Sequence, residues 1–191
     1  MYTPRRLFPH EIGKYQKHLL KLSPESRRLR FAYPITDDGI IEFCKKILKN
    51  FDKHVIYVVE SDWLDVIGVG HVSLEESNME LAFSVLDDWQ GHGIGNTLMA
   101  RCLEYCRNRN IKKGYMVCLQ SNQAIKHLCR KNGLALHTEH GETMADIELP
   151  NPTFITFFNE IATSHLAAFE HFSKASKRIT DLSIYALTDH K

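Results

Sequence analysis

The chain has 191 residues, of which 43% are hydrophobic and 25% charged, as in an ordinary soluble globular protein. Its 24 Lys and Arg balance 23 Asp and Glu, so the net charge of +1 gives no electrostatic reason to expect nucleic acid or a membrane as a partner. No apolar run approaches the roughly 20 residues of a membrane span. No signal peptide is recognised, and the five cysteines form no disulfide framework, so we expect a cytoplasmic protein.

Hydrophobic periodicity predicts the elements of the first 150 residues in chain order. Helical spacing indicates helices over residues 10–22 and about 39–49, the second capped by Thr36 or Asp37. The later elements are β-rich runs over 55–59, 66–72 and 79–86, a helix over 94–108, a strand over 114–119, a helix over 122–131, and strands over 134–137 and 143–149. The order α-α-β-β-β-α-β-α-β-β predicts hairpins first and parallel pairing near the middle.

Glycine and proline divide the chain into two parts. All ten glycines lie before residue 142, and all six prolines lie at or before residue 152. Pro150-Asn151-Pro152 is typical of a boundary, because proline continues neither a strand ladder nor a helix interior. We therefore predict a mixed domain over residues 1–150 and a helical extension over residues 151–191.

The extension carries a stripe of apolar side chains at alternating steps of four and three residues, which is a helical spacing. At 1.5 Å per residue a single helix would be about 50 Å long, which leaves one long helix or a break into two. An aromatic stripe is costly to expose, so we expect it to be buried against its own domain or against a second chain in a homodimer. The stripe consists of Phe154, Phe158, Ile161, His165, Ala168, Phe172, Ala175, Ile179, Leu182 and Ala186, and Phe157 and Phe169 widen it.

A glycine-rich segment lies between the third β-rich run and the helix after it, and it reads Asp87-Asp88-Trp89-Gln90-Gly91-His92-Gly93-Ile94-Gly95-Asn96-Thr97-Leu98. Glycine lets the backbone approach a ligand, and the N–H groups at a helix start attract an anion. The segment lacks the Gly-Lys-Ser/Thr of a P-loop, and Asn96 replaces the third glycine of a dinucleotide fingerprint. It predicts a phosphate site, with a turn that binds nothing as the alternative.

The wider pattern resembles the GNAT superfamily, the Gcn5-related N-acetyltransferases. Gln90-x-x-Gly93-x-Gly95 is similar to the family's pyrophosphate loop, and residues 79–86 look like its fourth strand. Residues 122–134 resemble its second signature, an Asn opening a helix that ends at Gly-Phe, with Leu134 in place of Phe. The resemblance covers roughly residues 10–149 and implies an α/β (α+β) GNAT fold, a mixed central sheet flanked by helices. Residues 22–31 are also similar to a segment in bacterial protein-lysine acetyltransferases.

The resemblance implies acetyl-CoA as the donor, with its pantetheine arm between the fourth and fifth strands. It implies pantetheine contacts at Ser84, Val85 and Leu86, and a further bond near the arm from Asn122. Lys126 and Arg130, one helical turn apart, either meet the adenosine 3′-phosphate or form a solvated basic face. The residues implied to hold the pyrophosphate are Gln90, Gly91, His92, Gly93, Ile94, Gly95, Asn96 and Thr97.

An amine acceptor with a lysine-like pKa of about 10.4 must lose a proton before it attacks a thioester. Glu80 is the only acid inside its β-rich run and matches the glutamate base of the histone-acetyltransferase branch, so we predict it as the base. The alternative is a strand-end carboxylate paired with a lysine. Cys129 stands where the family's tyrosine acid is expected, and it is either the proton donor or a buried structural thiol, with solvent then acting as the acid.

No metal site is predicted, since His137-Thr138-Glu139-His140 lacks a matching Cys or His pair. We predict an acetyl-CoA-dependent N-acetyltransferase that works by direct attack in a ternary complex, because no activated nucleophile is evident. The alternatives are a non-catalytic acetyl-CoA or CoA sensor, and an interaction protein that depends on its tail. A small amine, an aminoglycoside, a peptide N-terminus and a protein lysine all remain open as acceptors.

Overall fold

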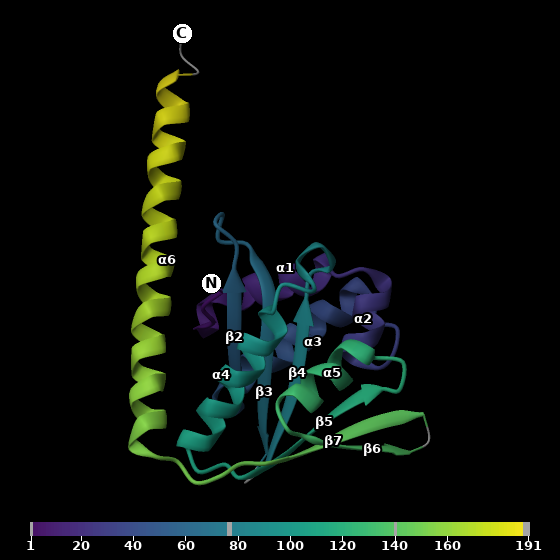
Figure 1. The fold of residues 1–191 in the computed structure, drawn as a ribbon. Coiled ribbons are helices and arrows are strands. Elements are labelled where there is room, and N and C mark those ends of the chain that lie inside the picture. Colours follow the sequence, from purple (N-terminus) through teal and green to yellow (C-terminus); the bar gives the residue numbers. More distant parts are fainter. Residues whose placement is uncertain (1, 76–77, 140, 189–191) are drawn as a thin grey trace.

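A mixed β-sheet forms the centre of the protein, with helices on both faces and one long helix along its edge (Figure 1). The computed structural model describes residues 2–75, 78–139 and 141–188. In this part of the chain the sheet has seven strands in the order β1-β2-β3-β4-β5-β7-β6. The strands are β1 (Arg5–Arg6), β2 (His54–Glu60), β3 (Val66–Glu75), β4 (Asn78–Val85), β5 (Lys113–Leu119), β6 (Ala135–Glu139) and β7 (Glu142–Glu148).

Several helices begin where polar side chains can accept hydrogen bonds from the first free N–H groups. Ser23, Thr36 and Asn122 cap α2, α3 and α5 in this way, with side-chain oxygens 3.1–3.2 Å from the accepted nitrogens. The helices are α1 (Ile12–Lys21), α2 (Pro24–Phe31), α3 (Asp37–Lys49), α4 (Ile94–Asn108), α5 (Gln123–Lys131) and α6 (Phe154–Thr188). The predicted order of elements is confirmed, with β1 and α2 added.

Strand pairing is antiparallel throughout the described sheet except between β4 and β5, which run parallel. That parallel ladder is short, since it runs only from Asn78 opposite Lys113 to Glu80 opposite Tyr115. Beyond these residues β4 continues to Val85 and β5 to Leu119 without pairing to each other. The sheet therefore opens in its middle, and the backbone groups along this edge of β4 are left for another partner.

Two apolar clusters pack on opposite faces of the sheet. The first lies between the sheet and α4 and takes Met79, Leu81 and Phe83 from β4. The second lies beneath α1 and α3, and the alternating residues of β4 point toward that side. The residues of β4 therefore alternate between the two faces of the sheet, which places Glu80 and Ser84 on the face opposite α4.

The C-terminal segment is one uninterrupted helix, α6, which runs alongside α4 and continues past the end of the sheet (Figure 1). Its predicted stripe is not buried against the domain: Phe154, Phe158 and Phe172 are 87%, 71% and 73% exposed. The side chain at Ala186 lies outside the described residues. Among the described residues no helix combines the length and apolar character of a membrane span. The division at residues 150–151 stays a prediction.

Candidate functional site

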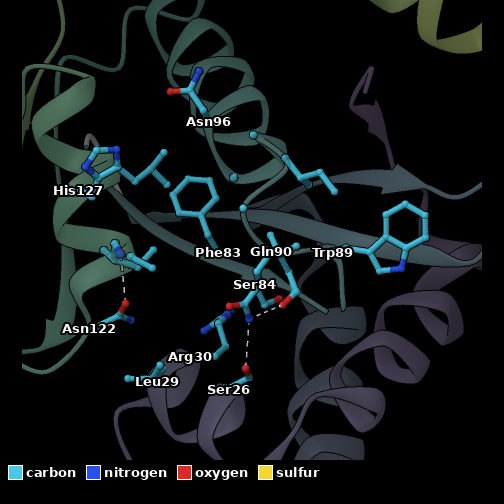
Figure 2. Close-up of a pocket in the computed structure, with 18 of the residues that line it drawn as sticks. Ser26, Leu29, Arg30, Phe83, Ser84, Trp89, Gln90, Asn96, Asn122 and His127 are labelled. Carbon is cyan, nitrogen blue, oxygen red and sulfur yellow. Dashed lines mark hydrogen bonds between the residues drawn. The ribbon is translucent and has the colours of Figure 1, made fainter. Parts of the chain in front are cut away.

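A cleft of about 450 Å³ opens at the splayed ends of β4 and β5, between α2 on one side and α4 and α5 on the other (Figure 2). The lining is mainly apolar, with polar groups at the α4 and α5 N-termini. The lining residues are Leu22, Ser26, Leu29, Arg30, Phe83, Ser84, Val85, Trp89, Gln90, Gly91, Gly93, Ile94, Gly95, Asn96, Asn122, Ala124, Ile125, His127, Leu128 and Lys131.

The glycine-rich loop presents backbone donors to this cleft. Gly91 and Gly93 have φ of 78° and 80°, a conformation that side chains with a Cβ disfavour. Gly93 is the N-cap of α4, and its carbonyl accepts hydrogen bonds from the N–H groups of Asn96 and Thr97. The preceding N–H groups, at Ile94 and Gly95, belong to the helix start, where no intrahelical acceptor exists. With the positive end of the helix dipole they make this part of the cleft wall a favourable environment for an anion.

Hydrogen bonds of Asp87 and Gln90 join this loop to the start of α2. The Asp87 carboxylate accepts hydrogen bonds from the Ser26 hydroxyl at 2.5 Å and from the Ser23 hydroxyl and N–H. The bond from Ser26 is the main reason that the pKa of Asp87 lies below its usual value. Gln90 Nε2 donates to the Val85 carbonyl at 3.2 Å and to Ser26 and Asp87, so its amide ties β4 to the loop (Figure 2).

A buried histidine sets the orientation of the Ser84 hydroxyl. His18 Nδ1 lies 3.0 Å from the Val66 carbonyl oxygen, which can only accept, so Nδ1 carries the proton. Burial lowers the pKa of His18 to about 4, so the ring is neutral at pH 7 and Nε2 is an acceptor. Ser84 Oγ, 2.9 Å from Nε2, must then donate to it. The lone pairs of Ser84 are left for the cleft, which therefore has a hydrogen-bond acceptor at this point.

Glu80 lies outside this cleft lining, at the last parallel pair of β4 with β5. Its side chain is exposed, and the described residues offer it no ion pair. Its charge is the main reason that the pKa of Tyr115, its neighbour on β5, is raised. On an extended strand Glu80 and Ser84 are about 13 Å apart, so the two groups can act on one bound molecule from opposite ends.

Acidic residues continue from Glu80 across the open face of the sheet. Residues directly paired on neighbouring strands point to the same face, and Tyr115 pairs with Asp146 and Lys113 with Glu148. Five exposed acids share this face with Lys113 and His137, and together they make it acidic. We call these acids the acidic face: Glu75, Glu80, Glu142, Asp146 and Glu148.

Cys129, the other predicted catalytic residue, is fully buried in the core beneath α5 and does not line the cleft. Burial raises the pKa of its thiol to about 11. The structure thus favours the structural interpretation of this thiol, and its role as proton donor stays a prediction without geometric support.

The structure brings most of the predicted cofactor-binding residues into one cleft, although their binding role stays a prediction. Leu86, His92 and Thr97 do not line it. Leu86 packs toward the core, the exposed His92 donates from Nδ1 to the Gln90 carbonyl at 2.8 Å, and the Thr97 hydroxyl donates to the carbonyls of Gly93 and Ile94. Neither Lys126 nor Arg130 lines the cleft, whereas Lys131 on the same helix does.

Sequence reasoning missed the wall that α2 contributes, with Ser26, Leu29 and Arg30. A local signal was present, because Ser23 followed by Pro24 is a typical helix start. It also missed His18, which lies 66 residues from Ser84, and no local pattern could have paired them. Within the described ranges no cluster of three or more His, Cys, Asp or Glu could hold a metal, and His140 of the rejected cluster lies outside those ranges.

Comparison with known proteins agrees with this geometry. Residues 20–134 match the model of the acetyltransferase (GNAT) family. An acetyltransferase of Pseudomonas aeruginosa is 25% identical over 130 residues, which are 65% of this chain and 70% of that protein. The GNAT domain of Streptomyces lividans PAT has a TM-score of 0.65 at 18% identity, covering 78% of this chain and 90% of that chain. Vibrio cholerae spermidine N-acetyltransferase, solved with CoA and spermine, has a TM-score of 0.60 at 18% identity, covering 78% and 94%.

Proposed function

Since the chain belongs to the GNAT family of acetyltransferases, we propose that it transfers the acetyl group of acetyl-CoA to an amine by direct attack in a ternary complex. The observation that carries this proposal is the cleft. It joins the unpaired edge of β4 to the anion-binding start of α4, which is the combination a pantetheine arm ending in a pyrophosphate requires.

In this proposal the pyrophosphate binds the N–H groups at Gly93–Gly95, and the pantetheine amides bond to the open edge of β4 near Ser84 and Val85. Asn122 contributes little to binding of the pantetheine arm, because its side-chain oxygen already accepts a hydrogen bond from the Ile125 N–H at the start of α5. The Ser84 lone pairs, oriented by His18, accept a hydrogen bond from an N–H of the bound donor or of the amine.

The reaction begins when the acceptor ammonium loses a proton to Glu80 through an intervening water. The neutral amine nitrogen then attacks the thioester carbonyl carbon, and an N–C bond forms. As the tetrahedral intermediate collapses, the C–S bond breaks and the nitrogen releases its second proton to solvent. The CoA thiolate leaves and takes a proton from solvent, because Cys129 is buried and its pKa of about 11 makes it a poor acid.

The acidic face supports a cationic acceptor. Glu80 belongs to it, at the point where the pairing of β4 with β5 ends, and Glu142, Asp146 and Glu148 extend it along β7. An ammonium group approaching the end of the gap would be attracted by these carboxylates and delivered beside the proposed base. The polyamine spermine bound to the Vibrio cholerae neighbour has this charge, and a lysine side chain does too.

Turnover of acetyl-CoA with spermine, a lysine peptide and an aminoglycoside tests the proposal. We expect acetylation of at least one amine, and a loss of about 100-fold in rate near neutral pH in Glu80→Gln with unchanged acetyl-CoA affinity. Glu142→Gln is the matched control, because it removes a carboxylate of the same face that lies on β7, two strands away from β4. Tight binding of acetyl-CoA without transfer to any amine would favour the sensor interpretation, and normal turnover by Glu80→Gln would exclude Glu80 as the base.

The reaction needs one chain only, because all the residues named for it come from one copy. A homodimer through the C-terminal helix is a separate proposal that depends on the surface of α6.

The five cysteines are free thiols, which supports the cytoplasmic location proposed from the sequence.

A further inference from the structure

Helix α6 docks on the domain with its polar side and leaves its apolar side uncovered. Among its described side chains only Ala167 is fully buried. Ten large apolar side chains are exposed along it, from 43% at Phe157 to 87% at Phe154. These side chains stay exposed although α6 packs against α4 and β1.

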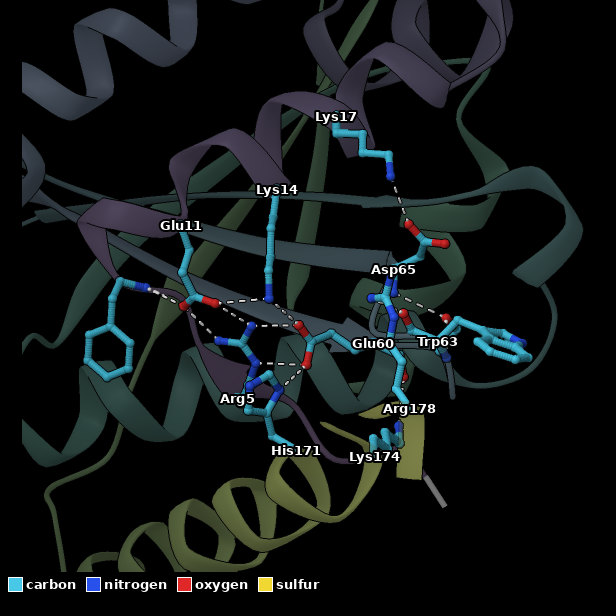
Figure 3. A network of polar contacts seen from close by, with 12 residues as sticks. Arg5, Glu11, Lys14, Lys17, Glu60, Trp63, Asp65, His171, Lys174 and Arg178 are labelled. Carbon is cyan, nitrogen blue, oxygen red and sulfur yellow. Dashed lines mark hydrogen bonds and ion pairs between the residues drawn. The ribbon is translucent and has the colours of Figure 1, made fainter. Parts of the chain in front are cut away.

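The polar contacts of α6 fix which side faces the domain. Glu160 accepts hydrogen bonds from Asn108 at 2.7 Å and from Arg109 at 2.8 Å. Farther along, His171 Nδ1 lies 2.6 Å from the carboxylate of Glu60, and Lys174 donates to the Glu60 backbone carbonyl at 2.9 Å (Figure 3).

Glu60 anchors this contact from within the domain. Its carboxylate is also bonded to Arg5 and Lys14, as Figure 3 shows. Burial alone would raise the pKa of Glu60, but the hydrogen bonds and charge of Arg5 lower it to about 2. The helix is thus held by specific charged contacts and cannot turn its apolar side inward without breaking them.

The exposed side has the repeat of a coiled coil. Its positions recur every seven residues in two series, one at Phe158, His165 and Phe172 and one at Ile161, Ala168 and Ala175. A repeat of 3.5 residues sustained over this length is typical of a helix that packs against another helix of the same repeat. We call the positions 154, 158, 161, 165, 168, 172, 175, 179 and 182 the seam.

The charge distribution argues for a protein partner over a lipid surface. Between Phe154 and Ser173 the helix has no Lys or Arg, and its two acids there, Glu160 and Glu170, both bond to the domain. Three cations follow in the rest of α6, and two of them, Lys174 and Arg178, bond to the domain as well. Helices that lie on membranes carry Lys and Arg beside the apolar face. A seam without charge of either sign can be self-complementary, as a two-fold interface requires.

The exposed area is sufficient for a stable dimer. At about 200 Å² for a whole aromatic side chain, the exposed apolar groups of α6 amount to the order of 1,000 Å². Patches on monomers are usually about 300–600 Å², and a standard interface buries about 800 Å² on each partner.

We propose that two copies of this chain associate through α6, antiparallel, with the seams facing each other and the two domains on the outside. This inference does not depend on the proposed acetyl transfer. In a parallel pair each seam residue would face the same residue of the second chain. Phe172 would then face Phe172, and Ala168 would face Ala168 and leave a gap between the helices. In an antiparallel pair the two series meet, so that Phe172 packs over Ala168 of the second copy and His165 over Ala175. This register also covers the exposed Leu182, which lies opposite Phe158.

Sedimentation velocity with the full chain tests the association. We expect the wild type at about 10 µM to have twice the 22.1 kDa mass of one chain. Phe158→Glu and Phe172→Glu should weaken the dimer at least 100-fold, since each introduces a charge at the centre of an apolar interface. Asn159→Glu is the matched control, because it adds the same charge one residue away from the seam at an exposed position, and it should stay dimeric.

Both phenylalanines are exposed in the single chain, so their replacement leaves the domain intact, and unchanged acetyl-CoA affinity or unchanged thermal unfolding verifies this. A monomeric wild type overturns the proposal, and so does an unaffected dimer in both Phe→Glu variants. Co-sedimentation of the wild type with phosphatidylcholine–phosphatidylglycerol vesicles, lost in Phe172→Glu, would overturn it in favour of a lipid surface.

Cysteine cross-linking tests the orientation, because all five native cysteines are buried. A Phe158→Cys chain mixed with a Leu182→Cys chain should form a mixed disulfide under mild oxidation. Neither chain alone should form one, since in the antiparallel register the two copies of residue 158 are 24 positions apart, or about 36 Å. Rapid cross-linking of Phe158→Cys with itself would contradict the antiparallel arrangement.

Discussion

Helices α4 and α6 lie side by side and use amphipathic patterns in opposite ways. α4 buries Ile94, Leu98 and Cys102 against the sheet, and its polar side faces α6. α6 contacts α4 with its own polar side and leaves its phenylalanines exposed to solvent. An apolar stripe therefore does not by itself show which side of a helix contacts its own domain. The surface of the neighbouring elements decides this.

The contact between the two helices is polar, and some of its buried polar atoms lack a hydrogen-bond partner. Arg101 donates to the Ser164 hydroxyl at 2.6 Å and to the Glu160 carbonyl at 3.3 Å. Among the described residues, Arg101 Nε and Asn108 Oδ1 are buried without a hydrogen-bond partner. Each such group costs about 1–3 kcal/mol. We infer that α6 is held less tightly than α4, and the following predictions examine that difference from the largest effect to the smallest.

The largest effect is expected at Glu60, where α6 meets β2. Glu60→Gln leaves the guanidinium of Arg5 buried without its main counter-charge, which should lower the free energy of unfolding by about 3 kcal/mol. Urea denaturation at pH 7 measures the change. Glu25→Gln removes an exposed partner of Arg28 and should have no measurable effect. Equal stabilities of the two variants would show that the buried network does not support the contact with α6.

At the start of α4, Gly95→Val should lower acetyl-CoA affinity by about 100-fold, or about 2.7 kcal/mol, because a branched side chain enters the proposed pyrophosphate site. A Cβ at Gly95 would have only an ordinary contact, 3.6 Å from Leu128, so the variant is expected to fold. Calorimetry measures the affinity. Ala100→Val, at an exposed position of the same helix, is the control, and equal affinities would remove the anion site from α4.

As the pH falls, the contribution of His18 to the free energy of unfolding should be lost before the contribution of Glu60. Burial lowers the pKa of His18 to about 4, so between pH 6.5 and 4 the unfolded chain binds a proton that the folded chain does not. Stability is therefore lost as the pH falls through this range, by about 2 kcal/mol between pH 7 and 5. The contribution of Glu60, whose pKa is lowered to about 2, persists down to about pH 4.5 and is lost below it.

Denaturation of His18→Gln at pH 7 and pH 5 checks this assignment. The variant lacks the titrating ring, so its stability should change less between the two pH values than that of the wild type. His10→Gln removes an exposed imidazole and should retain the full pH dependence. An unchanged dependence in His18→Gln would assign the effect to the other buried histidine, His71, whose pKa is lowered by burial as well.

The smallest effect compares two adjacent alanines of α6, of which Ala167 is buried and Ala168 is exposed. Ala167→Glu places a carboxylate between α6 and the domain and should destabilise the docking of α6 by about 1–2 kcal/mol, seen as faster limited proteolysis near residue 151. Ala168→Glu faces outward and should leave proteolysis unchanged while weakening the proposed dimer. Equal proteolysis of the two variants would show that α6 is not held by its polar side.

Much of the site could be predicted because its signals are local. The glycines that start α4 follow from backbone conformation, and the Thr36 and Asn122 caps follow from their immediate neighbours. The two-residue strand β1 was missed because it is too short to carry a pattern.

The sequence by itself determined the element order, the family and the glycine turn proposed to bind an anion, since each is carried by motifs whose own residues lie within about fifteen positions of one another. Only the tertiary structure decided that His18 holds Ser84, that Cys129 faces the core, and that acids of β3 and β7 share one face of the sheet with Glu80. It also decided which side of α6 docks. These features depend on surfaces that meet across 50 to 115 residues of chain, where complementarity of charge and shape outweighs the local pattern.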